Sequence, residues 1–150
     1  SLDDRAREAL ATLMAGRRWI WIAGNHDPAP PGVGGEALAS ARIDGIVFRH
    51  IADVGEDGPE ASGHYHPKAW LRGRGRPAFL VDARRAILPA FGAYTGGLDV
   101  ADPIFDRLLA PDALALMTGR RIVAAPRVAV AEIRRARRGA PMRRGVAAPS

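Results

Sequence analysis

The residues best suited to chemistry are the four histidines of the chain, because each follows or ends an apolar segment that predicts a strand: His26, His50, His64 and His66. In α/β proteins, ligands bind in the loops beyond the carboxyl ends of the strands, so these imidazoles are expected to meet at one sheet edge. The chain has no cysteine, so a bound metal must use His, Asn, Asp or Glu. The pattern predicts a nitrogen and oxygen site for Mn, Fe or Zn.

The last two histidines belong to residues 63–66, which read Gly-His-Tyr-His. In an extended segment the side chains at i and i+2 point to the same side, so His64 and His66 are expected to face one site. Tyr65 and Lys68 lie beside them and are candidates to contact a substrate phosphate, although packing at the surface explains both residues equally well.

The first histidine lies in residues 24–27, Gly-Asn-His-Asp, directly after the apolar run 19–23. Asn25 offers a neutral oxygen ligand. His26 can stay off the metal and donate a proton, and Asp27 is placed either to orient the His26 ring or to cap the following turn. These three residues complete the candidate site.

The segments that must position these residues follow an α/β pattern, because a helix over 2–14, capped by Ser1, precedes a strand over 19–23 that is expected to be covered on both faces. Asp44-Gly45 predicts the turn of a hairpin over 43–50. Further strands are expected at 60–63, 78–81, 86–88 and 121–125, a basic turn at 72–77, a glycine-rich loop at 91–99, and helical segments at 103–109, 111–117 and 128–138.

The chain length and composition predict one globular domain. There are 150 residues, 47% of them hydrophobic, and no apolar run is long enough to span a membrane. We expect a folded domain over residues 1–126 and a basic, arginine-rich tail over 127–150, with its last dozen residues disordered. The lack of cysteine fits a cytoplasmic protein.

The charge balance permits a nucleic-acid partner. The net charge is +6, and Lys68 is the only lysine among 22 basic residues. Arginine suits phosphate because its planar fork can donate two hydrogen bonds to it. A general compositional preference for arginine and alanine explains the same numbers, so basicity alone names no partner.

Taken together, the histidine motifs resemble the calcineurin-like metallophosphoesterase superfamily, whose motif blocks run D-x-H, G-D-x-x-(H or D), G-N-H-(D or E), a lone H and G-H-x-H. Residues 24–27 match the third block, His50 the lone histidine, and residues 63–66 the last block. The segments WIWIAGNHDP, SGHYHPKA and LPAFGAYTGGLD are similar to bacterial ligase-associated DNA-damage-response phosphoesterases, which are endonucleases. This similarity runs from residue 1 to about residue 125.

The resemblance implies a two-sheet sandwich flanked by helices (αββα) and metal-dependent hydrolysis of phosphodiesters, with DNA in repair as the substrate expected first. It implies two divalent metal ions, Mn first and Fe or Zn as alternatives. Asn25, His50 and His64 would bind the second metal and His66 the first, with His26 as the acid. The implied partners are DNA or another phosphodiester, and DNA ligase or helicase repair proteins.

The chain departs from the superfamily before Gly24. Only 23 residues precede it, and they contain neither D-x-H nor G-D-x-x-(H or D), so the sandwich is expected to lack its N-terminal strands. A start further upstream, a separate or cleaved segment, and degeneration each explain this. The chain alone is expected to be a weak or inactive catalyst. The alternative is a non-catalytic basic module that binds nucleic acid or a repair partner, and the oligomeric state is open.

Overall fold

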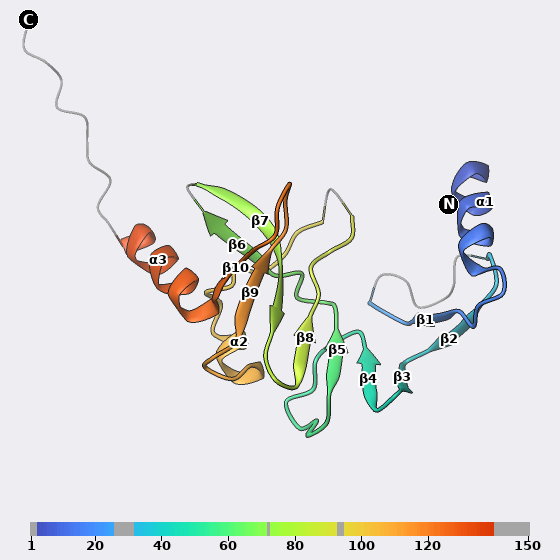
Figure 1. Ribbon diagram of the computed structural model, residues 1–150, viewed down its shortest axis with the longest axis horizontal. Coiled ribbons are helices and arrows are strands. Elements are labelled where there is room, and N and C mark those ends of the chain that lie inside the picture. Colours follow the sequence, from blue (N-terminus) through green and yellow to red (C-terminus); the bar gives the residue numbers. More distant parts are fainter. Residues whose placement is uncertain (1–2, 26–31, 72, 93–94, 140–150) are drawn as a thin grey trace, which may run out of the picture.

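The computed structural model describes residues 3–25, 32–71, 73–92 and 95–139 (Figure 1). His26 and Asp27 lie outside the described residues, as do Ser1 and the last eleven residues of the chain. Within the described part, no helix is both long and apolar enough to cross a bilayer.

The described residues form three helices and ten strands, and most of the strands are short. In chain order they are α1 (Asp4–Met14), β1 (Ile20–Ile22), β2 (Glu36–Leu38), β3 (Ser40–Ile43), β4 (Ile46–Arg49), β5 (Glu60–Ser62), β6 (Lys68–Leu71), β7 (Arg74–Val81), β8 (Arg85–Ile87), α2 (Ile104–Leu108), β9 (Leu114–Met117), β10 (Val123–Pro126) and α3 (Arg127–Gly139). Figure 1 shows α2 and α3 at one end of a large sheet, and α1 with β1 and β2 beyond its other end. The expected α/β class is confirmed, because a large multistranded sheet is flanked by helices.

Two sheets contain all of these strands. Strands β1 and β2 pair in parallel as a two-stranded sheet. The other sheet has eight strands in the order β10-β9-β7-β8-β5-β4-β3, with β6 paired to β7. At its centre β4, β5 and β8 run parallel, and their neighbours β3 and β7 are antiparallel to them. Three carboxyl ends therefore meet at one edge of this sheet.

The core lies on one face of the large sheet. Strand residues that alternate toward this face are buried, among them Val47, Ala78, Leu80, Ile87, Ala115 and Met117. Phe105 and Leu108 of α2 and Val130 of α3 pack into the same cluster. On the opposite face the side chains stay more than a third exposed, for example Ile46, Phe79, Leu88 and Leu114. Both α2 and α3 therefore cover the same face.

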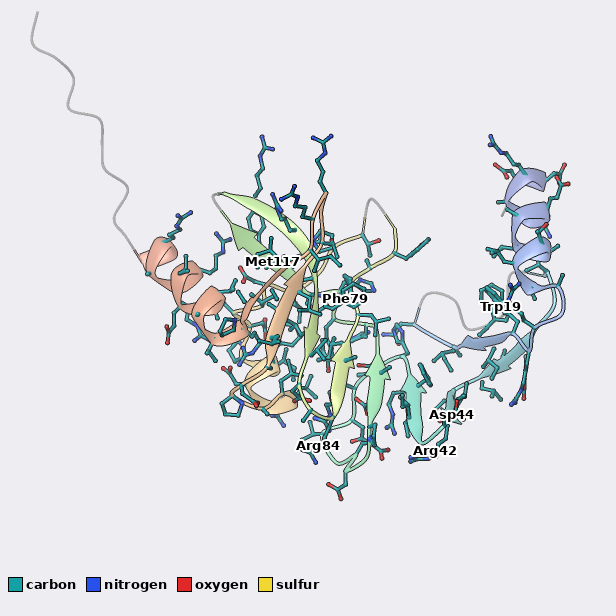
Figure 2. The ribbon with its side chains drawn as sticks, in the orientation of Figure 1. Trp19, Arg42, Asp44, Phe79, Arg84 and Met117 are labelled. Atoms are coloured by element: carbon teal, nitrogen blue, oxygen red, sulfur yellow. The ribbon has the colours of Figure 1, made fainter. Side chains whose placement is uncertain are left out.

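Local sequence explains the first helix and the hairpin. Asp3 caps α1, because its side chain accepts a hydrogen bond from the Ala6 backbone N–H at 2.7 Å, whereas Ser1 was expected to be the cap. The predicted hairpin is present as β3 and β4. Its turn residues Asp44 and Gly45 have φ values of 48° and 83°, as a tight hairpin turn requires (Asp44 is labelled in Figure 2).

Three local expectations were wrong. Residues 111–117 were expected to be helical, yet Leu114–Met117 form β9, because Ala115 and Met117 alternate inward between β7 and β10. The basic turn is shorter than expected, because β7 already begins at Arg74 and pairs with β6. Strand β1 is only half-buried, because it pairs with β2 in a sheet of two strands rather than lying inside the large one.

Candidate functional site

The candidate site lies where the central parallel strands end. His50 directly follows β4, and His64 comes two residues after β5. Because β4 and β5 are parallel and adjacent, their carboxyl ends bring the two imidazoles to the same edge of the sheet. The convergence of these two histidines, expected from their positions after strands, is present.

The two rings are in direct contact. His64 Nδ1 lies 3.1 Å from His50 Nε2, and the ring centroids are 5.0 Å apart at an interplanar angle of 77°. One of the two nitrogens carries the proton, so this contact is a hydrogen bond whose direction depends on the tautomers. Gly24 permits the approach of the β1 end, because a Cβ there would lie 3.0 Å from the His50 ring.

The backbone that carries His64 and His66 is not extended. Their φ values are 56° and 45°, in the left-handed region that residues with side chains seldom occupy. The expectation that an extended segment points both side chains one way was therefore wrong in its geometry. A turn replaces that segment, with the Tyr65 N–H donating to the Gly63 carbonyl at 2.7 Å.

Asn25, His50, His64 and His66 nevertheless line one cavity of about 450 Å³. The remaining lining residues are Tyr65, Thr95, Gly96, Gly97 and Leu98. A second cavity of about 430 Å³ shares His50, His66 and Thr95, and adds Gly24 and the exposed Phe91. The four sequence-predicted ligands thus border one space, although they come from three separate parts of the chain.

The glycine-rich loop closes one side of this cavity. The Leu98 N–H donates to the Tyr65 carbonyl at 2.9 Å, and the Lys68 N–H donates to the Leu98 carbonyl at 2.7 Å. A Cβ on Gly97 would lie 3.1 Å from the His66 Cβ and closer still to the His66 carbonyl oxygen. Only glycine therefore permits this close passage of the loop over the histidine turn.

The two candidate phosphate contacts have partners within the protein. The Lys68 ammonium donates to the Thr95 carbonyl at 2.7 Å. The Tyr65 ring packs edge-on against His64, with centroids 5.0 Å apart, and against Phe105 of the core, 5.9 Å away. Both residues border the cavity region, and their contact with a substrate stays a prediction.

The ligand atoms around this cavity meet part of the requirements of a metal site. Two nitrogens bound about 2.1 Å from one tetrahedral ion lie about 3.4 Å apart, close to the separation between His50 and His64. Asn25 adds an amide oxygen on the same cavity wall. Within the described residues, no group of three or more His, Cys, Asp or Glu side chains is arranged to hold a metal ion. His26 and Asp27 are not among the residues tested.

The chain is similar in structure to the Pseudomonas putida nuclease MPE. The similarity has a TM-score of 0.62 with 24% sequence identity, and it covers 79% of this chain. The chain spans 59% of the length of that nuclease. No protein-family model and no curated protein sequence matches. At this identity the likeness establishes the fold that the two chains share.

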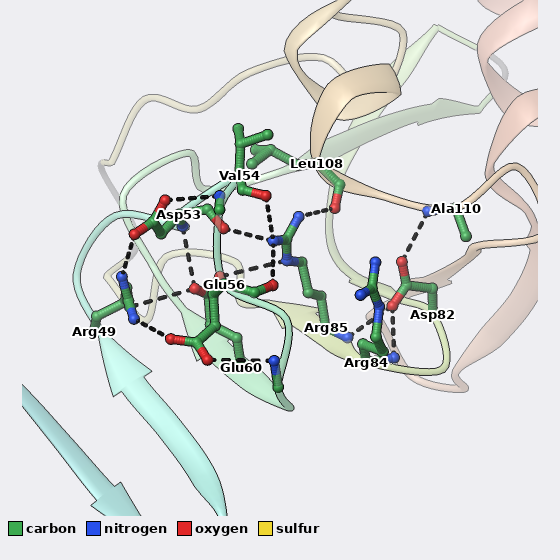
Figure 3. A network of polar contacts seen from close by, with 12 residues as sticks. Arg49, Asp53, Val54, Glu56, Glu60, Asp82, Arg84, Arg85, Leu108 and Ala110 are labelled. Atoms are coloured by element: carbon green, nitrogen blue, oxygen red, sulfur yellow. Dashed lines mark hydrogen bonds and ion pairs between the residues drawn. The ribbon is translucent and has the colours of Figure 1, made fainter.

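A network of charges joins the end of β4 to the starts of β5 and β8, and no sequence pattern predicted it (Figure 3). Glu60, at the start of β5, pairs with Arg49 Nε at 3.3 Å and with Arg85 Nε at 3.8 Å. The Arg85 guanidinium also donates to the carbonyls of Asp53, Glu56 and Leu108. The only sequence signal was a charged residue at an inward-alternating position in each of β5 and β8.

This network holds the connection that follows His50. The Asp53 N–H donates to Glu60 at 3.1 Å, and Arg49 pairs with Asp53 and Glu56. The hydrogen bond from the Gly55 N–H, together with Arg49, lowers the pKa of Asp53 against the opposing effect of its burial. The β4–β5 connection is therefore held by ion pairs that range from partly exposed, at Arg49–Asp53, to buried, at Glu60–Arg85.

Proposed function

We propose that this chain carries the histidine part of a metal-dependent phosphodiesterase site that hydrolyses nucleic acid, with DNA as the first substrate to test. The contact of His50 and His64 at 3.1 Å carries the proposal, because two imidazole nitrogens, a type of ligand that divalent metals favour, meet at the carboxyl edge of parallel strands. The shared fold with a protein named as a nuclease supports it.

In this proposal Asn25, His50 and His64 hold one divalent ion and His66 contributes to a second, with Mn the ion to test first. Divalent ions in such a site supply Lewis acidity toward phosphoryl oxygens and acidify water. His26 donates a proton to the leaving oxygen, and Asp27 orients its ring. Tyr65 and Lys68 border the phosphate position. On its own, the chain is expected to turn over slowly.

Mn²⁺ binding provides the direct test. Calorimetry or Mn²⁺ paramagnetic resonance should detect binding to the wild-type chain, and His50→Ala and His64→Ala should each weaken it at least tenfold, because each removes a ligand. Tyr65→Phe is the matched control, since it changes the same cavity wall without removing a proposed ligand. A wild-type chain that binds no Mn²⁺, or histidine variants that bind it as well as wild type, would refute the proposal.

A second candidate is a non-catalytic basic module that binds nucleic acid. It is favoured by four exposed arginines that form no ion pair with any described carboxylate: Arg74, Arg76, Arg120 and Arg121. The two candidates differ in the hydrolysis of bis(p-nitrophenyl) phosphate and of circular DNA with Mn²⁺. Metal-independent DNA binding with neither hydrolysis nor Mn²⁺ uptake supports the module.

A further inference from the structure

Four exposed arginines stand at the sheet edge that carries the histidines, and we name them the arginine edge: Arg74, Arg76, Arg120 and Arg121. The first two begin β7, and the other two lie in the turn between β9 and β10. Strand β7 is antiparallel to β8 and β9 is antiparallel to β7, so the start of β7 and the end of β9 lie at the carboxyl edge of β8. Figure 1 shows the start of β7 and the β9–β10 turn on that side.

Contacts join the two halves of the arginine edge. The Thr118 N–H donates to the Pro77 carbonyl at 2.9 Å, which ties the end of β9 to β7. The Arg76 guanidinium lies over the turn, because its Nη1 would be 3.2 Å from a Cβ on Gly119. The guanidinium of Arg76 is thereby placed beside the turn that carries Arg120 and Arg121.

The arginine edge also connects to the histidine cavity. Strand β6 begins two residues after His66, and Ala69 of β6 pairs with Arg76 of β7. At about 3.3 Å per residue, Ala69 is roughly 10 Å along the chain from His66. Lys68, in between, donates to the Thr95 carbonyl on the cavity wall.

No carboxylate in the described part of the chain neutralises the charge of this edge. Among the described residues no carboxylate forms an ion pair with any of the four, whereas Arg18, Arg42, Arg49, Arg85, Arg127, Arg134 and Arg135 all pair with carboxylates. Other exposed arginines without an ion pair, such as Arg5, Arg84 and Arg107, stand on separate elements. Clustered guanidinium groups repel one another unless an anion lies between them, and their planar fork matches the geometry of phosphate as well as that of carboxylate.

We infer that the arginine edge binds the sugar–phosphate backbone of a nucleic-acid strand and leads it toward the histidine cavity. Delivery of the strand to the histidine cavity rests on the proposed function, whereas binding of the strand by the arginine edge does not. Contacts from guanidinium groups to phosphate carry no sequence information, so binding through these contacts is expected to be independent of sequence. Four phosphate contacts correspond to a slope of log affinity against log salt of about −2.8 for single-stranded nucleic acid.

The test compares two variants of equal charge. One replaces the arginine edge (R74Q/R76Q/R120Q/R121Q), and the control replaces four exposed arginines elsewhere (R5Q/R17Q/R84Q/R107Q). Binding of a fluorescent 20-nucleotide oligothymidine is followed by anisotropy in EDTA at three salt concentrations. The edge variant should lose on the order of a hundredfold in affinity at 0.1 M salt and about 3 units of salt slope, while the control loses less than about threefold.

Equal losses in both variants would overturn the inference, because they would reflect net charge alone. So would unchanged binding by the edge variant, or tighter binding of polyglutamate than of the oligonucleotide. Circular dichroism melts confirm that both variants fold. The control variant should keep the Mn²⁺ uptake and the bis(p-nitrophenyl) phosphate hydrolysis of the wild type. A wild-type chain that neither takes up Mn²⁺ nor hydrolyses bis(p-nitrophenyl) phosphate would refute the proposed function and leave the anisotropy result intact.

Discussion

Arg85→Met tests whether the buried charge network stabilises the fold. The Arg85 and Glu60 side chains are 5% and 1% exposed, so removing the guanidinium leaves a carboxylate out of reach of water. The change also removes the donor from the carbonyls of Asp53, Glu56 and Leu108. Methionine fills a similar volume, so the cavity contribution is small.

The expected loss follows from these contacts. Removing one partner of a buried ion pair costs about 3–5 kcal/mol of stability. Arg49 remains 3.3 Å from Glu60 and still compensates part of the charge of its carboxylate, so the lower figure of about 3 kcal/mol applies. With an m-value of about 1.5–2 kcal/mol/M in urea, the unfolding midpoint should fall by about 1.5–2 M.

Urea unfolding followed by tryptophan fluorescence measures this shift, since urea does not screen the ion pairs as a salt would. Arg84→Met is the matched control: it changes the exposed neighbouring arginine and should shift stability by less than about 0.5 kcal/mol. The double variant E60Q/R85M should lose less than the sum of its single variants, because no carboxylate is then left unpaired. Equal midpoints for Arg85→Met and Arg84→Met would refute the reasoning.

Two further substitutions test other parts of the structure. Asp82→Ala removes the acceptor of the Arg84, Arg85 and Ala110 N–H groups and should cost about 1–2 kcal/mol at pH 6. Burial raises the pKa of Asp82, but these hydrogen bonds outweigh it and hold the pKa below 3.8. The stabilisation by the Asp82 carboxylate is therefore complete above that pH and is lost as the pH falls through the pKa of the folded state. An equal stability difference between wild type and Asp82→Ala at pH 6 and pH 3 in urea unfolding would contradict this. Gly97→Ala should cost about 1–3 kcal/mol in thermal melts, because a Cβ collides with His66. Gly96→Ala, with open space around it, should change little, and similar losses in both would argue against a close loop passage.

Local structure that depends on residues close together in the sequence was predictable. Asp44-Gly45 supplies left-handed backbone at both turn positions, so the β3–β4 hairpin followed from two residues. The short helix α2 and the strand at 78–81 were likewise marked by their own apolar pattern. These elements need little information from distant parts of the chain.

Structure that depends on distant partners was not predictable. Ala and Leu favour helix, so residues 111–117 were interpreted as helical, but pairing with β7 on one side and β10 on the other outweighs that preference. Similarly, nothing near Glu60 in the sequence indicates Arg85 as its partner, because β5 and β8 become neighbours only in the folded sheet.

The candidate site falls between these cases. Histidines placed after strands were expected to converge, and His50 and His64 do so because β4 and β5 are parallel neighbours. The local geometry was not foreseen, since the left-handed turn at His64 and His66 is imposed by the passage of Gly97 and by the Tyr65–Leu98 hydrogen bond. The positions of the histidines after strands therefore predicted their convergence, and tertiary contacts set the arrangement.

The left-handed backbone at His64 and His66 has an evolutionary consequence. That conformation costs a residue with a side chain about 1–2 kcal/mol, and glycine would relieve it. A lineage drifting without selection on these positions would gain stability by exchanging either imidazole for glycine. Both imidazoles therefore occupy positions where the backbone conformation alone favours glycine.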